Sequence, residues 1–493
     1  MKLKQIALIS SSIILSSCAL LGPDYHEPQL NAPQAWSARD GNTAQSIESM
    51  PDMAWWQKFN DSQLNRLIES ALVHNNNLQV AMGNLLQAQA SLKKAQMGWV
   101  PTLSIGGTGF AGQYFNPGFQ NNSSYPLLNS VSQNNPQNFD GYAFGAMPSY
   151  TLNVFSLIKQ GEIAKLNVAL QKQSVNAMRL AVISQVANSY FTLLGLHKQL
   201  ELQQQMLADA RDLRKYNQIQ YRKGSIGQLN LEGLDQFISS LEAKIPEIED
   251  SITQTENALQ VLTNNNPGKI QMGNTFDNIN TDGIIPVNLP SEVLKSRPDI
   301  AVAEYQLQVN NANIGAVTSQ FFPTISLTGN VGQMTMQLSN LFNAGGDFWF
   351  GALGAAMPVF NLGLYADVDK AKGGYYAAYY NYIQTVRNAF SQVDNGLSKH
   401  DSLTKQYKIQ EAGYQKAQNM YAIGQKQYKN GAISLANTVG FKLNIDYTKA
   451  GLNQLKIQQL NSIVNLYQVL GGGYNYESSL TTIKKFNDDH DIN

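Results

Sequence analysis

The chain has 493 residues with 35 basic and 35 acidic side chains, and charged residues make up only 14% of it. A formal net charge of zero gives no electrostatic reason to expect a nucleic-acid partner. No apolar stretch beyond the N-terminus reaches the roughly eighteen residues that a membrane-spanning helix needs, which excludes an ordinary helical membrane protein.

The N-terminus has the features of a secretion signal with a lipid-attachment site. Lys2 and Lys4 precede a short apolar run, which ends at Leu15-Ser16-Ser17-Cys18. Small residues before a cysteine are typical of a bacterial lipobox, so we expect Cys18 to become the mature N-terminus and to carry diacylglycerol and an N-acyl chain such as palmitate. Cys18 is the only cysteine and has no partner for an internal disulfide. The alternative to a lipobox is an ordinary secretion signal. We expect no cofactor other than the lipid on Cys18.

The remainder of the chain is an internal duplication. Val100-Pro101-Thr102-Leu103 matches Phe322-Pro323-Thr324-Ile325, and further on Tyr221-Arg222-Lys223-Gly224 matches Tyr428-Lys429-Asn430-Gly431. A period of about two hundred residues indicates a duplicated domain and not a short-repeat solenoid. The predicted parts are a signal peptide (1–17), a lipid-anchored N-terminal segment (18–58), a first repeat (59–262), an equatorial linker (263–290), a second repeat (291–470) and a C-terminal tail (471–493).

Each repeat contains one very long predicted helix. Residues 162–222 contain no proline and a single glycine, and their apolar residues recur at helical spacing. Such a helix would measure roughly 90 Å, which exceeds any compact core and is typical of a coiled coil. The same pattern recurs over residues 364–429. Each long helix should end in a turn, at Gly224 and Gly431, because glycine adopts the conformation that ends a helix.

Each repeat also contains two predicted strands that lack basic residues. Apolar residues alternate with small or polar ones, as over residues 142–154. No Lys or Arg occurs between Lys94 and Lys159 or between Arg297 and Lys370. A lipid-facing basic side chain costs roughly 2–4 kcal/mol at the bilayer midplane, so these windows indicate membrane strands. The strands are predicted at about 101–115, 141–155, 323–336 and 347–360, with outer loops at 116–140 and 337–346.

Four strands cannot close into a barrel by themselves. An open strand edge is not tolerated in lipid, because its backbone groups find no hydrogen-bond partners there. Copies of the chain must therefore complete the sheet for one another. Two copies would give an eight-stranded barrel filled by its own side chains, and three would give a twelve-stranded barrel with a lumen. The residues by themselves leave both assemblies open.

Four local motifs stand out beside the repeat. They are Gly22-Pro23-Asp24-Tyr25, Trp55-Trp56-Gln57-Lys58-Phe59-Asn60-Asp61, Arg297-Pro298-Asp299-Ile300 and Phe321-Phe322-Pro323. Together with the repeat they resemble the TolC-like outer-membrane efflux proteins, and in particular their lipoprotein branch, the NodT-type outer membrane factors.

This resemblance implies a mostly α protein with a membrane β-barrel. Its form would be a homotrimeric channel-tunnel, with a twelve-stranded β-barrel in the outer membrane on a twelve-helix periplasmic α-barrel and an equatorial belt. It also implies a passive duct of a tripartite efflux or secretion system, which conducts drugs or other small toxic compounds to the exterior. The implied partners are outer-membrane lipid, a periplasmic adaptor (membrane fusion) protein and an inner-membrane transporter of the RND or MFS type.

The resemblance further implies a constriction at the periplasmic tip. Well-known family members carry acidic residues six and nine positions after the second turn glycine, where this sequence has Asn437 and Gly440. That departure puts a carboxylate gate in doubt, so constriction would depend on packing, amide hydrogen bonds and Tyr428. The candidate tip residues are Tyr428, Gly431, Ala436, Asn437, Gly440 and Gly224. Glu232 and Asp235 are alternative sources of charge, although a solvated helix face explains them at least as well.

Two polar residues are candidate helix caps. Asp299 would cap a helix that starts at Ile300, and Asn77 would do the same in the first repeat.

No motif in the sequence assembles an enzyme site. Residues 107–112 fit the G-x-G-x-x-G pattern, but they lie within a strand pattern with no helix behind it. No P-loop, HExxH or GxSxG motif is present, and the five histidines are scattered. We therefore predict a protein that is not an enzyme. Two alternatives to an export duct remain. One is a periplasmic coiled-coil lipoprotein without a pore, although such a protein has no use for strand pairs that lack basic residues. The other is an envelope hydrolase.

Overall fold

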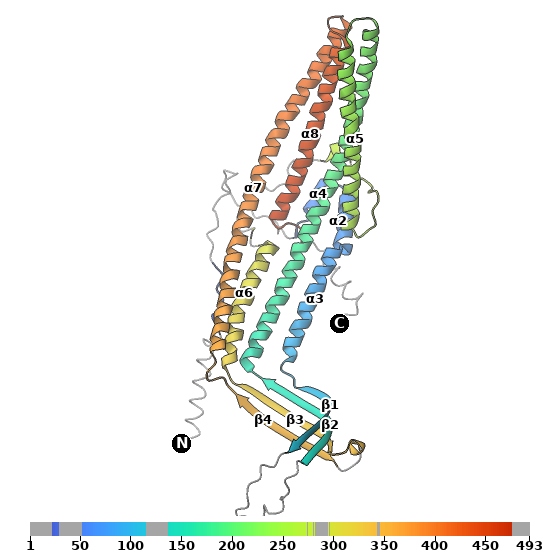
Figure 1. The fold of residues 1–493 in the computed structure, drawn as a ribbon. Coiled ribbons are helices and arrows are strands. Elements are labelled where there is room, and N and C mark those ends of the chain that lie inside the picture. The colour runs from blue at the N-terminus through green and yellow to red at the C-terminus, as the bar shows by residue number, and fades with distance from the viewer. Residues whose placement is uncertain are drawn as a thin grey trace, which may run out of the picture. The chain divides into compact units, whose positions relative to one another are not determined.

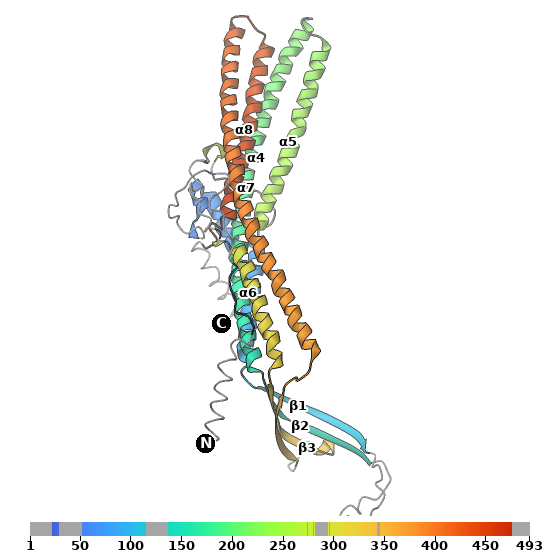
Figure 2. The same ribbon diagram turned by 90° about the vertical axis from the view of Figure 1, so that its left-hand side faces the viewer.

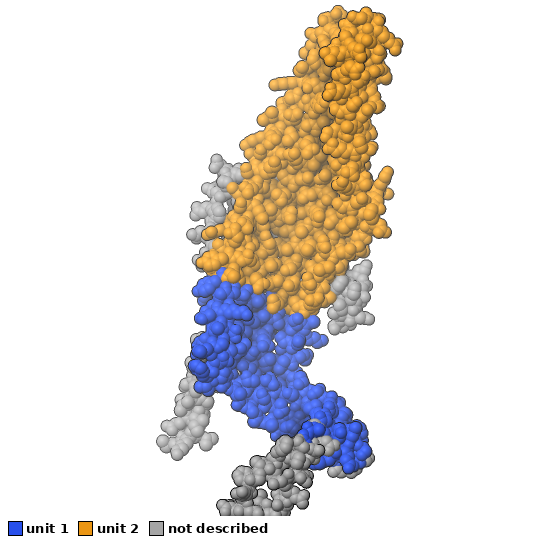
Figure 3. Space-filling view, viewed as in Figure 1, with its two compact units in different colours: residues 1–26, 89–166, 308–376 blue, residues 27–88, 167–307, 377–493 orange. Residues whose placement is uncertain are grey.

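The structure is a computed structural model that describes residues 22–28, 52–114, 137–273, 275–279, 281, 294, 296–342 and 346–475. The predicted signal peptide, Cys18 and most of the first outer loop lie outside these ranges. The chain forms two compact units (Figure 3). Unit 1 comprises residues 1–26, 89–166 and 308–376, and unit 2 comprises residues 27–88, 167–307 and 377–493. Each unit therefore draws on both sequence repeats.

The elements follow the same order in both repeats (Figure 1). After η3 (Trp55–Phe59), the first repeat contains α2 (Ser62–His74), α3 (Asn76–Met97), β1 (Thr102–Tyr114), β2 (Gln137–Leu152), α4 (Val154–Arg222) and α5 (Gln228–Leu262). After η5 (Phe276–Asn278), the second contains α6 (Pro298–Thr318), η7 (Ser319–Phe321), β3 (Thr324–Thr335), η8 (Leu338–Asn340), β4 (Asp347–Ala356), α7 (Leu362–Lys429) and α8 (Leu435–Val469).

Among the helices in the described ranges, none combines the length and the apolar character needed to cross a membrane.

Unit 1 holds a four-stranded antiparallel sheet in the order β1-β2-β3-β4 (Figure 1). Each repeat supplies one hairpin, with Thr102 opposite Ser149 in the first and Thr324 opposite Ala356 in the second. Pairs between β2 and β3 join the hairpins and are interrupted at Pro148, because proline has no N–H to donate. The G-x-G-x-x-G match lies inside β1, as its strand pattern predicted.

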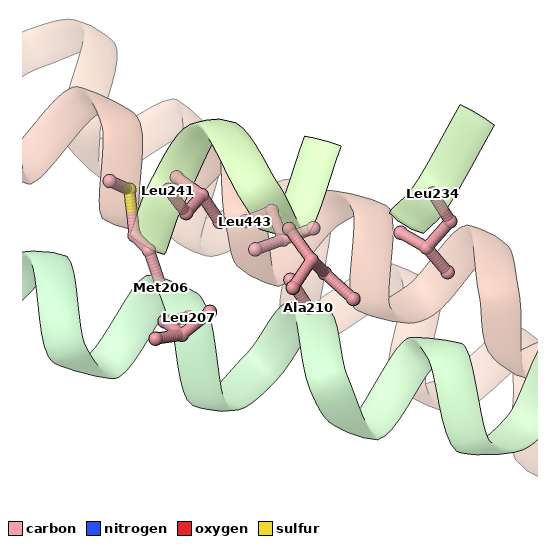
Figure 4. Packing of buried hydrophobic residues seen from close by; sticks show 7 residues of the cluster. Met206, Leu207, Ala210, Leu234, Leu241 and Leu443 are labelled. Atoms are coloured by element: carbon pink, nitrogen blue, oxygen red, sulfur yellow. The ribbon is translucent and has the colours of Figure 1, made fainter. Parts of the chain in front are cut away.

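Unit 2 is built on paired long helices. α4 and α7 have 69 and 68 residues, and α5 and α8 have 35 each. At the end of the unit that contains the helix turns these four helices run side by side (Figures 1 and 2). One apolar cluster joins α4, α5 and α8 (Figure 4): it contains Met206, Leu207, Ala210, Leu234, Ile238, Leu241 and Leu443. The first helical hairpin is thus packed against the second.

The Trp55-Trp56 motif packs into the core of unit 2. Both indole rings are fully buried, and the Trp55 ring stacks on Tyr467 of α8 with ring centroids 4.9 Å apart. Asp61 caps α2, because its Oδ1 accepts hydrogen bonds from the amides of residues 63 and 64 at 2.8 and 3.0 Å. Its Oδ2 accepts a 2.8 Å hydrogen bond from the hydroxyl of Tyr190 in α4. The motif is therefore a folding element that holds helices from both repeats.

In each repeat a side chain near the start of one helix donates a hydrogen bond to the last carbonyl of another helix. In the first, Asn75 Nδ2 donates to the carbonyl of Leu262, the last residue of α5, at 2.9 Å. In the second, Arg297 Nη1 donates to the carbonyl of Val469, the last residue of α8, at 2.6 Å. These side chains satisfy carbonyls that have no partner within their own helix.

The structure corrects both predicted helix caps, although Asp299 Oδ1 does accept a 3.0 Å hydrogen bond from the amide of Ile300. Asn75, and not Asn77, caps α3, because its Oδ1 accepts from the amide of Leu78 at 3.1 Å. α6 begins at Pro298, so Asp299 lies inside the first turn and forms a two-point ion pair with Arg297, at 3.0 and 2.7 Å. Proline is favourable at the first position of a helix, because the backbone N–H groups of the first turn have no partner within the helix and proline lacks one. α6 therefore begins at Pro298, two residues earlier than expected.

Candidate functional site

The two helix turns of unit 2 have the same backbone conformation. Gly224 and Gly431 have φ angles of +71° and +72°. In both turns the amide of the next residue donates to a carbonyl five residues earlier in the chain, at 2.9 Å. This is the Schellman motif that ends a helix. A β-carbon at either glycine would meet no heavy atom within 4 Å, so the positive φ, and not crowding, accounts for glycine here.

The structure brings most of the predicted tip residues together at the second turn. Tyr428 is 41% exposed and lies in the last turn of α7, just before Gly431. Ala436, Asn437 and Gly440 follow in the first two turns of α8. The amide of Asn437 donates to the Oγ of the capping Ser434 at 3.2 Å. Gly224 lies in the other turn, so the candidate set comes from two hairpins, and its gating role stays a prediction.

Of the two alternative charged residues near the first turn, Asp235 forms an ion pair between α5 and α4, whereas Glu232 accepts a 3.3 Å hydrogen bond from Gln228. Arg214 donates to both carboxylate oxygens of Asp235, at 2.9 and 3.1 Å, and this hydrogen bonding lowers the pKa of Asp235. Arg211 pairs with Glu242 at 2.6 Å. All four side chains are substantially exposed, so solvent screens both pairs and they add little to stability.

A buried polar cluster links α4 to α8 below the turns. Asp209 and Asp446 are 5% and 7% exposed, and Lys442 Nζ forms an ion pair with Asp209 Oδ1 at 2.5 Å. The side chain of Asp209 is also hydrogen-bonded to that of Asp446. The pKa of Asp446 is raised to about 7, and burial is the largest cause of the rise; the hydrogen bond to Asp209 and the charge of Asp209 also raise it, whereas Lys442 and Lys449 lower it. Near neutral pH the carboxyl group of Asp446 is therefore partly protonated.

Sequence reasoning did not find this cluster, because its members are more than two hundred residues apart. One signal was present in the chain. Asp209 stands in the apolar stripe formed by Met206, Leu207 and Ala210, where an acidic residue needs a buried partner.

The sheet of unit 1 exposes large apolar side chains. Leu103 and Ile105 of β1 are 70% and 72% exposed, and Trp349 and Leu353 of β4 are 80% and 75% exposed. β1 and β4 are the outer strands of the described sheet. An apolar surface of this kind marks a site of contact with lipid or protein.

No group of three or more His, Cys, Asp or Glu side chains suited to a metal ion occurs in the part of the chain that the structure describes.

Residues 67–265 and 289–472 match the protein family described as outer membrane efflux protein. The chain belongs to this family. The efflux protein is 29% identical to the probable outer membrane lipoprotein SilC of Salmonella typhimurium, over 96% of the chain and 99% of SilC. It is 28% identical to the cation efflux system protein CusC of Escherichia coli K12, over 94% of the chain and 98% of CusC. The open state of the Neisseria gonorrhoeae MtrE outer membrane channel matches it with a TM-score of 0.76 and 26% identity, over 92% of this chain and 98% of that one.

These comparisons confirm the resemblance to outer-membrane efflux proteins, the mostly helical fold with its small sheet and the prediction that the chain is not an enzyme. The efflux function is thereby confirmed at the level of the family. The positions of the predicted domain limits and the roles of the tip residues stay predictions.

Proposed function

We propose that three copies of this efflux protein form a channel-tunnel in the outer membrane, which is the exit duct of a tripartite pump. The four-stranded sheet carries this proposal. Its outer strands β1 and β4 present unpaired backbone groups and apolar side chains, which lipid tolerates only when the edges are joined to other strands. Three sheets joined edge to edge give a twelve-stranded barrel with a lumen, whereas two give a barrel filled by side chains.

The long helices would line the periplasmic tunnel. The hairpin of α4 and α5 and that of α7 and α8 pack against each other through one apolar cluster, so each copy would contribute these four helices to the tunnel wall. Conduction would be passive, and no cofactor is needed for it. The energy would come from an inner-membrane transporter of the RND or MFS type through a periplasmic adaptor, and the cargo would be drugs or other small toxic compounds.

We also propose a lipid anchor on Cys18. The lipobox pattern supports it, and so does the lipoprotein name of SilC. At about 0.8 kcal/mol per buried methylene, several acyl chains would hold the N-terminus durably in the membrane.

At the periplasmic tip, Tyr428 and Asn437 are proposed to narrow the entrance in place of carboxylates. The exposure of the Tyr428 ring and the position of Asn437 on the first turn of α8 support this role.

The test of the proposed function compares two matched substitutions in β1. Leu103→Arg places a charge among the exposed apolar side chains, and Ser104→Arg places it on the opposite face, because successive strand residues point to opposite faces. A lipid-facing Arg costs roughly 2–4 kcal/mol, so Leu103→Arg should reduce the amount of trimer in outer membranes far more than Ser104→Arg does. Mass measurement of the purified protein in detergent and survival of a deletion strain on toxic compounds complete the test.

A monomer that becomes water-soluble after removal of its acyl chains would refute the proposal. Equal effects of the two substitutions would also refute it, because they would show that neither face of the sheet meets lipid.

A further inference from the structure

The two helix turns carry uncompensated positive charge. Arg222 and Lys223 lie at the first turn, and Lys426 and Lys429 lie in the last turn of α7. All four side chains are exposed, and none takes part in an ion pair within the described residues. No Asp or Glu occurs over residues 216–231 or 417–441.

The surroundings do not cancel this charge. Further from the turns the basic side chains of α4 are matched by acidic ones, because Arg211, Arg214 and Lys215 pair with Glu242, Asp235 and Asp212. The helix dipoles contribute little, since each turn joins the negative C-terminal end of one helix to the positive N-terminal end of the next. Basic residues at a helix C-terminus also stabilise the helix, but that role leaves their charge in place.

The imbalance is local to the turns. Residues 212–235 and 416–442 together contain eight basic and three acidic side chains, whereas the whole chain contains 35 of each. In a trimer with its hairpin turns around one entrance, the four unpaired cations of each copy would form a ring. At about 0.1 M salt the screening length is about 10 Å, so the field of these cations extends beyond the side chains themselves.

We propose that the periplasmic entrance of the duct is anion-selective, with Arg222, Lys223, Lys426 and Lys429 as the residues that determine this selectivity. The inference rests on the proposed function and assigns a class of solute to it. Small anions, including compounds that carry an ionised acid group, are concentrated at the entrance, and small cations are depleted there. Asn437 and Gly440 agree with this, because they leave the entrance without the carboxylates that would oppose it.

The test is the reversal potential of the purified trimer in a planar bilayer under a tenfold potassium chloride gradient. The wild-type protein should show a chloride-to-potassium permeability ratio of about three or more, and the ratio should fall toward one when both solutions are raised to about 1 M, where the screening length is about 3 Å. The variant R222Q/K223Q/K426Q/K429Q should lose the preference, and the corresponding variant with four glutamates should reverse it. The control K58Q/K269Q, which neutralises two exposed lysines far along the chain from both turns, should behave as wild type.

Inorganic tripolyphosphate provides a second measurement that needs no current. Calorimetry on the detergent-solubilised trimer should show binding that weakens at least tenfold in the quadruple glutamine variant and is unchanged in the control. A cation-preferring wild type, or tripolyphosphate binding that the quadruple variant retains, would overturn the inference while leaving the duct intact. A trimer that binds tripolyphosphate as expected but passes no current would instead count against the proposed function.

Discussion

The buried pair of Asp209 and Asp446 predicts an unusual dependence of stability on pH. With its pKa raised to about 7, Asp446 holds a proton in the folded protein that an ordinary aspartate in the unfolded chain has already released above about pH 4. The folded state binds the additional proton, so this contribution to stability is fully present below about pH 4 and is lost as the pH rises through 7. Each pH unit within that window corresponds to about 1.4 kcal/mol.

The substitution Asp446→Asn removes the titration while preserving the shape of the side chain. Between about pH 5.5 and pH 8 the wild-type protein should lose about 2 kcal/mol per protomer through this group, and the variant should not. For a chain of this length the difference amounts to roughly 2 °C in the thermal midpoint. The neutral amide can donate a hydrogen bond to Asp209, so the variant should also be the more stable protein at pH 8.

Thermal unfolding in detergent, followed by circular dichroism at both pH values, measures this effect. Asp369→Asn is the matched control, because Asp369 is 77% exposed and pairs only loosely with Lys372, at 3.3 Å. It should leave the pH dependence unchanged. If Asp446→Asn showed the same pH dependence as the wild type, Asp446 would not titrate near pH 7 in the folded protein, and the reasoning from its burial would be refuted.

Three further substitutions test the packing of unit 2 by the same thermal assay, with trimer yield as a second readout. Trp55→Ala removes a fully buried ring and should destabilise the protein by about 3–5 kcal/mol, and a loss below about 1 kcal/mol would contradict its place in the core. Gly195→Ala places a methyl group against the side chain of Ile457 and should cost about 1–3 kcal/mol, whereas a neutral result would show that α8 can move away. Asn75→Ala leaves the carbonyl of Leu262 without its donor and the amide of Leu78 without its cap and should cost about 1–3 kcal/mol, while Asn75→Asp, which keeps the cap but cannot donate, should recover only part of the loss.

The features that sequence reasoning found are those encoded by local pattern. The strand pairs were recognisable because apolar alternation and the absence of Lys and Arg extend over whole segments, and the long helices because proline is absent from residues 162–222. The turn glycines were recognisable because only glycine adopts a positive φ without strain, and both have one. The errors lay in the limits of elements: α3 is capped by Asn75 instead of Asn77, and β2 begins at Gln137 instead of about residue 141.

The sequence alone therefore established that long helices alternate with strand pairs that lack basic residues. Composition, periodicity and the duplication were sufficient for this, because each is a property of a continuous stretch of chain. The contacts between residues from distant parts of the chain were determined only by the tertiary structure. Asp209 and Asp446, and likewise Arg297 and the carbonyl of Val469, are brought together by helices that pack across the two repeats. Contacts of this kind depend on the rotation and stagger of neighbouring helices, which are set by the packing of many side chains at once and leave no periodic trace in the sequence.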